Sequence, residues 1–106
     1  MINIDDFSKI ELKVGTVLEA EVVEASEKLI KLKVDLGEES PRQVLTGLKL
    51  YYKPEYFVGK QFIFVANLEP RMMMGLESQG MILCTDSKKP IPLKPSSKVV
   101  PGSQIC

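Results

Sequence analysis

The stretch NLEPRMMMGLESQGM, from Asn67 to Met81, lies between two apolar runs, FIFVA (Phe62 to Ala66) before it and ILCT directly after it. One proline and two glycines interrupt the stretch, and most of its other residues are polar, charged or methionine. This pattern predicts two core strands joined by a connector too long for a tight hairpin. Such loops commonly carry function because the strands beneath hold them in place. The alternative is a plain connection in which Met72 to Met74 fill gaps in the core.

The segments before this stretch alternate between apolar and polar residues, as half-buried strands do. Leu12 to Val22 is expected to form one long strand, in which Gly15 predicts a bulge or a sharp bend. A long bent strand suits a small barrel because it can take part in two sheets. Ile30 to Val34 predicts a second strand with two lysines on its outer face, and Arg42 to Thr46 predicts a third. The even-numbered residues give the first strand its apolar side: Leu12, Val14, Leu18, Ala20 and Val22.

The second half of the chain completes an all-β pattern. Gly47 to Lys60 is rich in tyrosine, and its Pro54 to Phe57 part predicts a short helix. Gln61 to Ala66 is apolar on both faces, so one face is expected in the core and the other under the aromatic segment or a second subunit. Short strands are predicted at Ile91 to Leu93 and Lys98 to Ile105. Five core strands with a helical segment between the third and fourth predict an OB-fold, a five-stranded Greek-key barrel, with C-terminal β additions.

Composition limits the kinds of function. A chain of 106 residues has about the size of one domain, so residues 1–106 are expected to form one. The chain has no histidine, and its two cysteines, Cys84 and Cys106, lack metal-ligand spacing, so no metal or cofactor is expected. No apolar run reaches the roughly 18 residues of a membrane span. The acidic N-terminus does not resemble an export signal, which favours a cytoplasmic location.

Charge is balanced overall but unevenly distributed along the chain. The net charge is zero and the isoelectric point is 6.3, whereas a typical nucleic-acid-binding domain has one above about 9. Residues 1–27 carry seven acids and two bases, and residues 28–60 carry seven bases and four acids. This balance argues against strong nonspecific binding of nucleic acid and leaves room for a modest basic face.

Catalytic chemistry finds no support in the sequence. Ser78 has no histidine partner, and no pair of carboxylates falls on opposing loops. Gly75 and Gly80 lack the lysine that a phosphate-cradling loop carries after its last glycine. The chain is therefore not expected to be an enzyme by itself.

Five blocks of the chain carry a family resemblance: DFSKIELKVGTV (Asp6 to Val17), EKLIKLKVDLGEE (Glu27 to Glu39), RQVLTGL (Arg42 to Leu48), YYKPEYFVGK (Tyr51 to Lys60) and VANLEPRMMMGLESQGMIL (Val65 to Leu83). In this order they resemble the tRNA-binding domain that occurs as a free-standing bacterial protein, as the C-terminal domain of many methionyl-tRNA synthetases and in EMAP-II-like factors. The resemblance covers about residues 5–105. It implies an OB-fold that dimerises and binds tRNA by its shape, without catalytic activity. Attached to a synthetase, such a domain adds tRNA affinity and assists aminoacylation.

The candidate tRNA-binding residues lie on one strand face and in the opening stretch. Lys31 and Lys33 share an outer face, where cations can meet successive phosphates or simply keep an exposed sheet solvated. In the loop, amide side chains can reach base edges and arginine can pair with phosphate, whereas Asn67 can instead cap the loop backbone. The candidates are Lys31, Lys33, Arg42 (which could extend the lysine face), Asn67, Arg71, Ser78 and Gln79.

The loop also departs from the family pattern. Met72 and Met74 stand where the family often has lysine or arginine, so tRNA binding is expected to be weaker than in a more basic member. The aromatic residues of the crossing segment are expected to cover the barrel or a dimer interface rather than to stack on RNA. They are Tyr51, Tyr52, Tyr56 and Phe57.

Protein interaction is the alternative function. A small dimeric chaperone associated with export shares this domain type, and a neutral charge balance suits a client-binding surface. Apolar residues of the strand at Gln61 to Ala66 and of the C-terminus (Val99, Val100 and Ile105) independently predict a homodimer. The expected partners are tRNA, a second copy of the chain and an aminoacyl-tRNA synthetase, with no DNA and no membrane. The initial Met1 fits both a free-standing protein and a domain taken from a synthetase.

Overall fold

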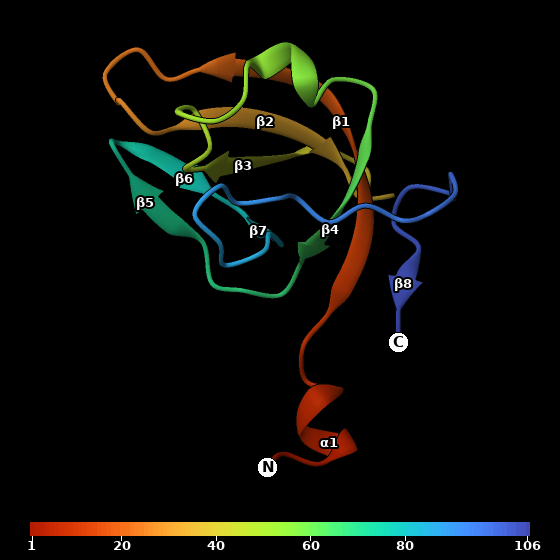
Figure 1. Ribbon diagram of the computed structural model, residues 1–106. Coiled ribbons are helices and arrows are strands. Elements are labelled where there is room, and N and C mark those ends of the chain that lie inside the picture. Colours follow the sequence, from red (N-terminus) through yellow and green to blue (C-terminus); the bar gives the residue numbers. More distant parts are fainter.

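Strand β1 (Leu12–Val22) organises the sheet because its two halves pair with different neighbours. In the computed structural model, which describes residues 1–106, the first half pairs with β4 (Gln61–Val65) and the second half with β2 (Ile30–Asp35), both antiparallel (Figure 1). Thr16 is the crossover point, since it pairs with Asp35 on one side and Gln61 on the other. The long strand shared by two sheets, expected from the alternation, is confirmed.

The main sheet runs in the order β3-β2-β1-β4-β7, where β3 is Arg42–Thr46 and β7 is Met81–Ile82. Strand β8 (Gln104–Ile105) pairs with the first residues of β1. The two ends of the sheet approach each other, because the backbone N–H of Gln79 donates to the carbonyl of Gln43 at 2.7 Å. The result is the predicted all-β, nearly closed OB-like barrel.

Helical structure is limited to two short segments. Helix α1 (Ile4–Phe7) begins with a capping box, in which Asn3 and Asp6 each accept a backbone N–H of the other. The 3-10 helix η1 (Pro54–Tyr56) lies in the predicted place between β3 and β4. In Figure 1 α1 projects away from the barrel, whereas η1 lies along its rim.

The core fills the barrel from all of its strands and from the end of η1. Phe57, Phe62 and Phe64 are fully buried, together with apolar residues of β1, β2, β3 and β7. Tyr52 and Tyr56 pack against this core, and the Tyr56 and Phe62 ring centroids lie 6.2 Å apart. The prediction that the aromatic segment covers the barrel is confirmed for these residues, although Tyr51 stays exposed.

Gly15 was predicted to mark a bulge or a sharp bend, and the bulge in β1 lies instead at Leu18. The register to β2 shifts between Val17 and Glu19, so the side chain of Leu18 turns outward and Val17 enters the core. Gly15 has a different role, because a Cβ there would lie 2.5 Å from Val34 Cγ1 and 2.9 Å from Phe64 Cδ1. The glycine therefore allows close packing of β1 on the core.

The outer face of β4 is covered by the segment that follows β7. The side-chain amide of Gln61 donates to the carbonyl of Val99 at 2.6 Å and accepts from its N–H at 3.0 Å. The chain then continues to β8, on the edge of β1 opposite β4. The two predicted C-terminal strands are short, since only β8 and a single bridge between Cys84 and Pro92 form there. The sequence pattern did not single out this cover.

No helix of the structure is long and apolar enough to cross a membrane.

Candidate functional site

The lysine face is the outer surface of β1 and β2, defined here by Lys31, Lys33, Glu19 and Glu21. Antiparallel pairing places Glu19 opposite Lys33 and Glu21 opposite Lys31. The resulting ion pairs measure 3.1 Å between Lys33 Nζ and Glu19 and 2.6 Å between Lys31 Nζ and Glu21. Each predicted cation therefore has a carboxylate beside it, and the face is much closer to neutral than two bare lysines would be.

An open groove of about 390 Å³ crosses this face. Seven of its ten lining residues carry charged or amide side chains. A polar groove with both cations and carboxylates can take a partner that offers phosphates together with hydrogen-bond donors. The lining residues are Glu19, Ala20, Glu21, Lys31, Leu32, Lys33, Pro41, Arg42, Gln43 and Gln79.

Arg42 does not extend the stripe of lysines, because β2–β3 pairing places it opposite Val34. Its guanidinium donates two hydrogen bonds to Glu38, from Nε at 2.8 Å and from Nη2 at 2.7 Å. Its Nη1 donates to the carbonyls of Ala66 and Gln79. The hydrogen bonds between Arg42 and Glu38 lower the pKa of the Glu38 carboxyl and raise the pKa of Arg42. Arg42 thus ties together three segments of the barrel.

Ser78 and Gln79 close the barrel beside β3. The Ser78 hydroxyl is buried, accepts the N–H of Leu45 at 3.0 Å and donates to the carbonyl of Gly80 at 3.1 Å. The Gln79 side-chain oxygen accepts the N–H of Gln43 at 3.0 Å, while its backbone N–H donates to the Gln43 carbonyl. The side-chain amide nitrogen of Gln79 has no hydrogen-bond partner within the chain. Gln79 is one of the residues that line the groove on the lysine face.

Asn67 connects the start of the loop to the chain before β1. Its side-chain oxygen accepts the N–H of Glu11 at 2.8 Å, and its amide nitrogen donates to the carbonyl of Lys9 at 2.7 Å. The alternative prediction, that Asn67 caps the backbone of its own loop, is therefore wrong in its target, because the side chain bonds backbone groups of another segment. The capped backbone belongs to the distant segment before β1.

The connector between β4 and β7 contains a hairpin that the sequence pattern did not predict. Strand β5 (Arg71–Met73) pairs with β6 (Leu76–Ser78) through a two-residue turn at Met74 and Gly75. Both turn residues have positive φ, 51° and 76°, as a type I′ turn requires. Asparagine is the usual first residue of such turns, which explains why a methionine there gave no hairpin signal.

The hairpin carries one exposed candidate without a side-chain partner in the chain. Arg71 is exposed and forms neither an ion pair nor a side-chain hydrogen bond. Met72 and Met74 are 64% and 58% exposed, so they do not fill gaps in the core. A second groove of about 390 Å³ lies beside the hairpin, and Arg71, Leu68 and Met81 are among its lining residues. This groove combines apolar side chains with charges at Glu69 and Arg71.

The structure therefore divides the seven candidates into two groups. Four can reach a ligand: Lys31, Lys33, Arg71 and the amide nitrogen of Gln79. The polar groups of the other three, Arg42, Asn67 and Ser78, form hydrogen bonds within the protein. Sequence reasoning did not single out Glu19, Glu21 and Gln43, which also line the first groove. The sequence does show charged residues at alternate positions of β1, but only the strand register reveals that these residues lie opposite the lysines.

Comparisons with known proteins agree with this barrel over its whole length. The family model described as "Putative tRNA binding domain" matches residues 12–104. A methionine–tRNA ligase of Methanococcus aeolicus is 49% identical over 106 residues, which is 100% of this chain and 16% of the ligase. The chain thus spans about a sixth of the length of such curated relatives.

Two solved structures share the fold. A MetRS-related protein from Pyrococcus horikoshii is 36% identical with a TM-score of 0.90, covering 100% of this chain and 98% of that one. The chaperone CsaA of Bacillus anthracis is 29% identical with a TM-score of 0.91, covering 100% of this chain and 99% of that one.

Proposed function

This chain belongs to the tRNA-binding domain family, and from that premise we propose that residues 1–106 form one non-catalytic module that binds folded tRNA by its shape. The observation that carries the proposal is the match of the family model to residues 12–104, which include every strand of the barrel except the last residue of β8. The elbow of folded tRNA is the proposed target, because recognition through phosphates and 2′-hydroxyls needs few base-specific contacts.

Direct contacts are assigned to the groups that face solvent. Lys31 and Lys33 would meet phosphates from the lysine face, and Arg71 would pair with phosphate from the hairpin β5–β6. The free amide nitrogen of Gln79 would donate to a phosphate, a 2′-hydroxyl or a base edge in the first groove. A small number of cations accounts for binding that is specific for shape and moderate in strength.

The remaining candidates are proposed to support binding indirectly. Arg42 and Ser78 join β3 to the segment between β6 and β7, so they fix the hairpin relative to the lysine face. Asn67 holds the start of the connector against the chain before β1. Their replacement would lower tRNA affinity by loosening the two contact surfaces rather than by removing a contact.

Two settings fit this function. The chain could act as a free-standing protein, as the similarity along nearly the full MetRS-related protein supports. It could equally be the part of a methionine–tRNA ligase that adds tRNA affinity and assists aminoacylation, as the similarity to a sixth of such ligases supports. In either setting the proposed location is the cytoplasm, where tRNA is charged.

The function is tested by variants that replace a cation of either proposed surface with uncharged glutamine. Lys31→Gln with Lys33→Gln, and separately Arg71→Gln, should each weaken binding of folded tRNA and make binding less dependent on salt, by about one unit of salt slope per cation removed. Lys9→Gln with Lys13→Gln changes the net charge as much as the first pair, but these residues lie just after α1 and at the start of β1. Equal binding by all variants and the wild type would contradict the assigned contacts.

A homodimer is part of the proposal. Ile2, Ile4 and Ile10 are exposed on and around α1, and Val100 is 76% exposed near the C-terminus. Helix α1 projects from the barrel (Figure 1), and its Ile4 is 76% exposed, so this side chain is available for an interface. A mass of two chains in light scattering at micromolar concentration is expected, and Ile4→Asp should shift it toward one. A monomeric wild type would contradict this part.

Binding of an unfolded protein is the second candidate function. The similarity to the chaperone CsaA supports it, as do the exposed methionines beside the second groove, since methionine adapts to varied apolar partners. The two functions separate in one comparison, in which either folded tRNA or an unfolded protein is added to the purified chain before size-exclusion chromatography. A shift of the elution volume with the unfolded protein alone would favour the second candidate.

A further inference from the structure

Three lysine ammonium groups gather on two tyrosine rings, on a part of the surface that the tRNA contacts proposed above leave unused. Tyr52 and Tyr56 stack on each other with ring centroids 4.6 Å apart. The Nζ of Lys60 lies 4.4 Å from the Tyr56 centroid, that of Lys89 lies 5.1 Å from the Tyr52 centroid, and that of Lys94 lies 5.5 Å from the Tyr56 centroid. These five residues are called the lysine–tyrosine cluster below.

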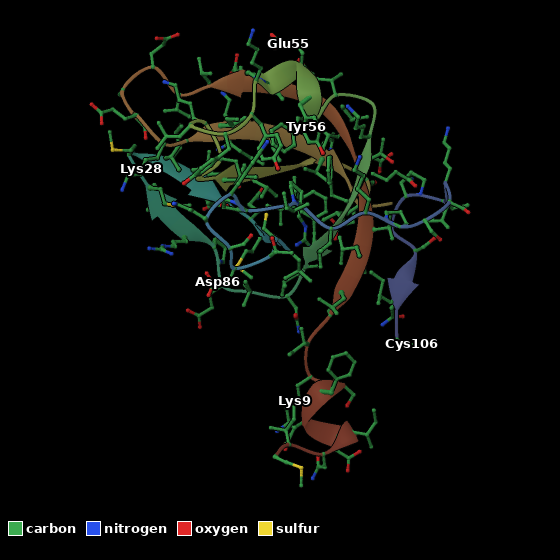
Figure 2. All side chains as sticks on the ribbon, in the orientation of Figure 1. Lys9, Lys28, Glu55, Tyr56, Asp86 and Cys106 are labelled. Atoms are coloured by element: carbon green, nitrogen blue, oxygen red, sulfur yellow. The ribbon has the colours of Figure 1, made fainter.

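The cluster comes from two segments that are far apart in the chain, residues 52–60 and residues 89–94. The tyrosines belong to η1 and the residues just before it, Lys60 immediately precedes β4, and the other two lysines belong to the segment after β7. The Tyr52 hydroxyl donates to the carbonyl of Pro90 at 2.8 Å, which holds Lys89 beside the ring. Figure 2 shows Tyr56 in the upper part of the barrel, well away from Lys9, which follows α1.

The charge of the cluster is not balanced within the protein. None of its three lysines forms an ion pair, in contrast to Lys31 and Lys33 on the lysine face. Lys60 donates to the carbonyl of Tyr56, whereas the ammonium groups of Lys89 and Lys94 are exposed and have no acceptor within the chain. Glu55 and Asp86 lie in the neighbouring segments, but neither forms an ion pair with a cluster lysine.

The geometry selects phosphate as the ligand chemistry. Each ammonium lies over a ring face that attracts its charge and positions it, while its N–H groups remain able to donate. The two rings are half-buried and stacked on each other, which leaves less ring surface on which a base could stack. The cations are spread over both rings on an exposed surface, which suits successive phosphates of a chain better than one small anion.

We propose that the lysine–tyrosine cluster is a second RNA-binding surface, which contacts the phosphate backbone of the bound tRNA without reading its bases. The proposal rests on the tRNA binding proposed above. It assigns to Lys89 and Lys94 a share of the affinity that the paired lysines of the lysine face cannot supply alone.

Binding of folded tRNA to the full chain tests the proposal across a range of salt concentrations. Lys89→Gln with Lys94→Gln should lower affinity at low salt by roughly five- to twenty-fold and reduce the salt slope by about one to two units. The matched control, Lys9→Gln with Lys13→Gln, should change affinity by less than about two-fold at the same net charge. Lys89→Arg with Lys94→Arg should bind like the wild type, and thermal melts of all variants would show that each is folded.

The outcomes separate the possible failures. Wild-type affinity in the Lys89→Gln, Lys94→Gln variant would overturn the second surface and leave the proposed function standing. A wild type that binds no tRNA at low salt would overturn both. A third arm titrates inorganic phosphate into isotope-labelled protein and follows the NMR signals of Lys89 and Lys94. The assignment to an RNA chain would be overturned if these signals shift and saturate at phosphate concentrations like those of the RNA phosphates.

Discussion

At the scale of single residues, the carboxylates beside the lysines matter as much as the lysines. Glu19 and Glu21 each hold one ammonium group of the lysine face, at 3.1 Å and 2.6 Å. Exposed pairs of this kind contribute little to stability, about 0.2–1 kcal/mol each. They do compete with an incoming phosphate for the same cation, so they weaken binding to RNA without being needed for the fold.

Removing both carboxylates is expected to strengthen tRNA binding. Glu19→Gln with Glu21→Gln frees Lys33 and Lys31, and we expect about three- to ten-fold higher affinity at low salt. The measurement is a binding titration with folded tRNA at low and at moderate salt. Glu24→Gln with Glu27→Gln is the matched control, because it changes the net charge equally and removes no ion-pair partner. An equal gain in both variants would show that only net charge counts.

The Arg42–Glu38 pair predicts that the barrel loses stability in acid. The hydrogen bonds from Arg42 lower the pKa of the folded Glu38 carboxyl below its ordinary value of 4.5. The unfolded chain therefore binds a proton more readily, so the stabilisation is complete above that value and is lost as the pH falls through the folded pKa.

Urea unfolding at a series of pH values checks this prediction. The free energy of unfolding of the wild type should fall between about pH 5 and pH 3. Glu38→Gln should be less stable than the wild type at pH 7 and should lose less of its stability over the same interval. Parallel curves for the two proteins would mean that another carboxyl is responsible for the acid sensitivity.

Residue roles could be predicted from the sequence only in part. The alternation in Ile30 to Val34 was enough to place both lysines on an outer face, and the structure confirms that position. Their ion-pair partners, and the internal bonds of Arg42, depend on strand register and on a contact with residues beyond position 60. Such contacts are formed only when distant segments meet, so local patterns carry no signal for them.

At the scale of elements, Gly15 marks the closest approach of β1 to the core. Gly15→Ala should cost about 2–3 kcal/mol of unfolding free energy, because its methyl group would overlap Val34 and Phe64 in a packed interior. Urea unfolding measures the loss. Gly47→Ala is the control, since an added Cβ there meets nothing within 4 Å. A loss of similar size in both variants would show that backbone effects, and not packing, determine the cost.

The long strands followed from alternation, whereas the short irregular features did not. β1, β2, β3, η1 and β4 lie where the pattern placed them, because each has a long apolar face or clear Pro and Gly punctuation. The bulge at Leu18 was not predicted because no glycine marks it. The hairpin β5–β6 was not predicted because methionine occupies the first turn position. The C-terminal cover of β4 depends on tertiary contacts alone.

At the scale of the whole molecule, the charge distribution accounts for the kind of binding that we propose. The net charge is zero, so long-range attraction to RNA is weak. Exposed cations occur on the lysine face, on the hairpin and in the lysine–tyrosine cluster, and they come from segments that only the folded barrel brings into fixed positions. A rigid ligand such as folded tRNA can meet several of them together, which a flexible RNA can do only by losing conformational entropy.

The most direct test is therefore binding of the purified protein to folded total tRNA and to unstructured single-stranded RNA of similar length, at low and at moderate salt. We predict tighter binding of folded tRNA, with a salt slope of about four to five units, as expected for about five phosphate contacts. Equal affinity for the two RNAs, or no binding of tRNA at low salt, would contradict recognition of tRNA by shape.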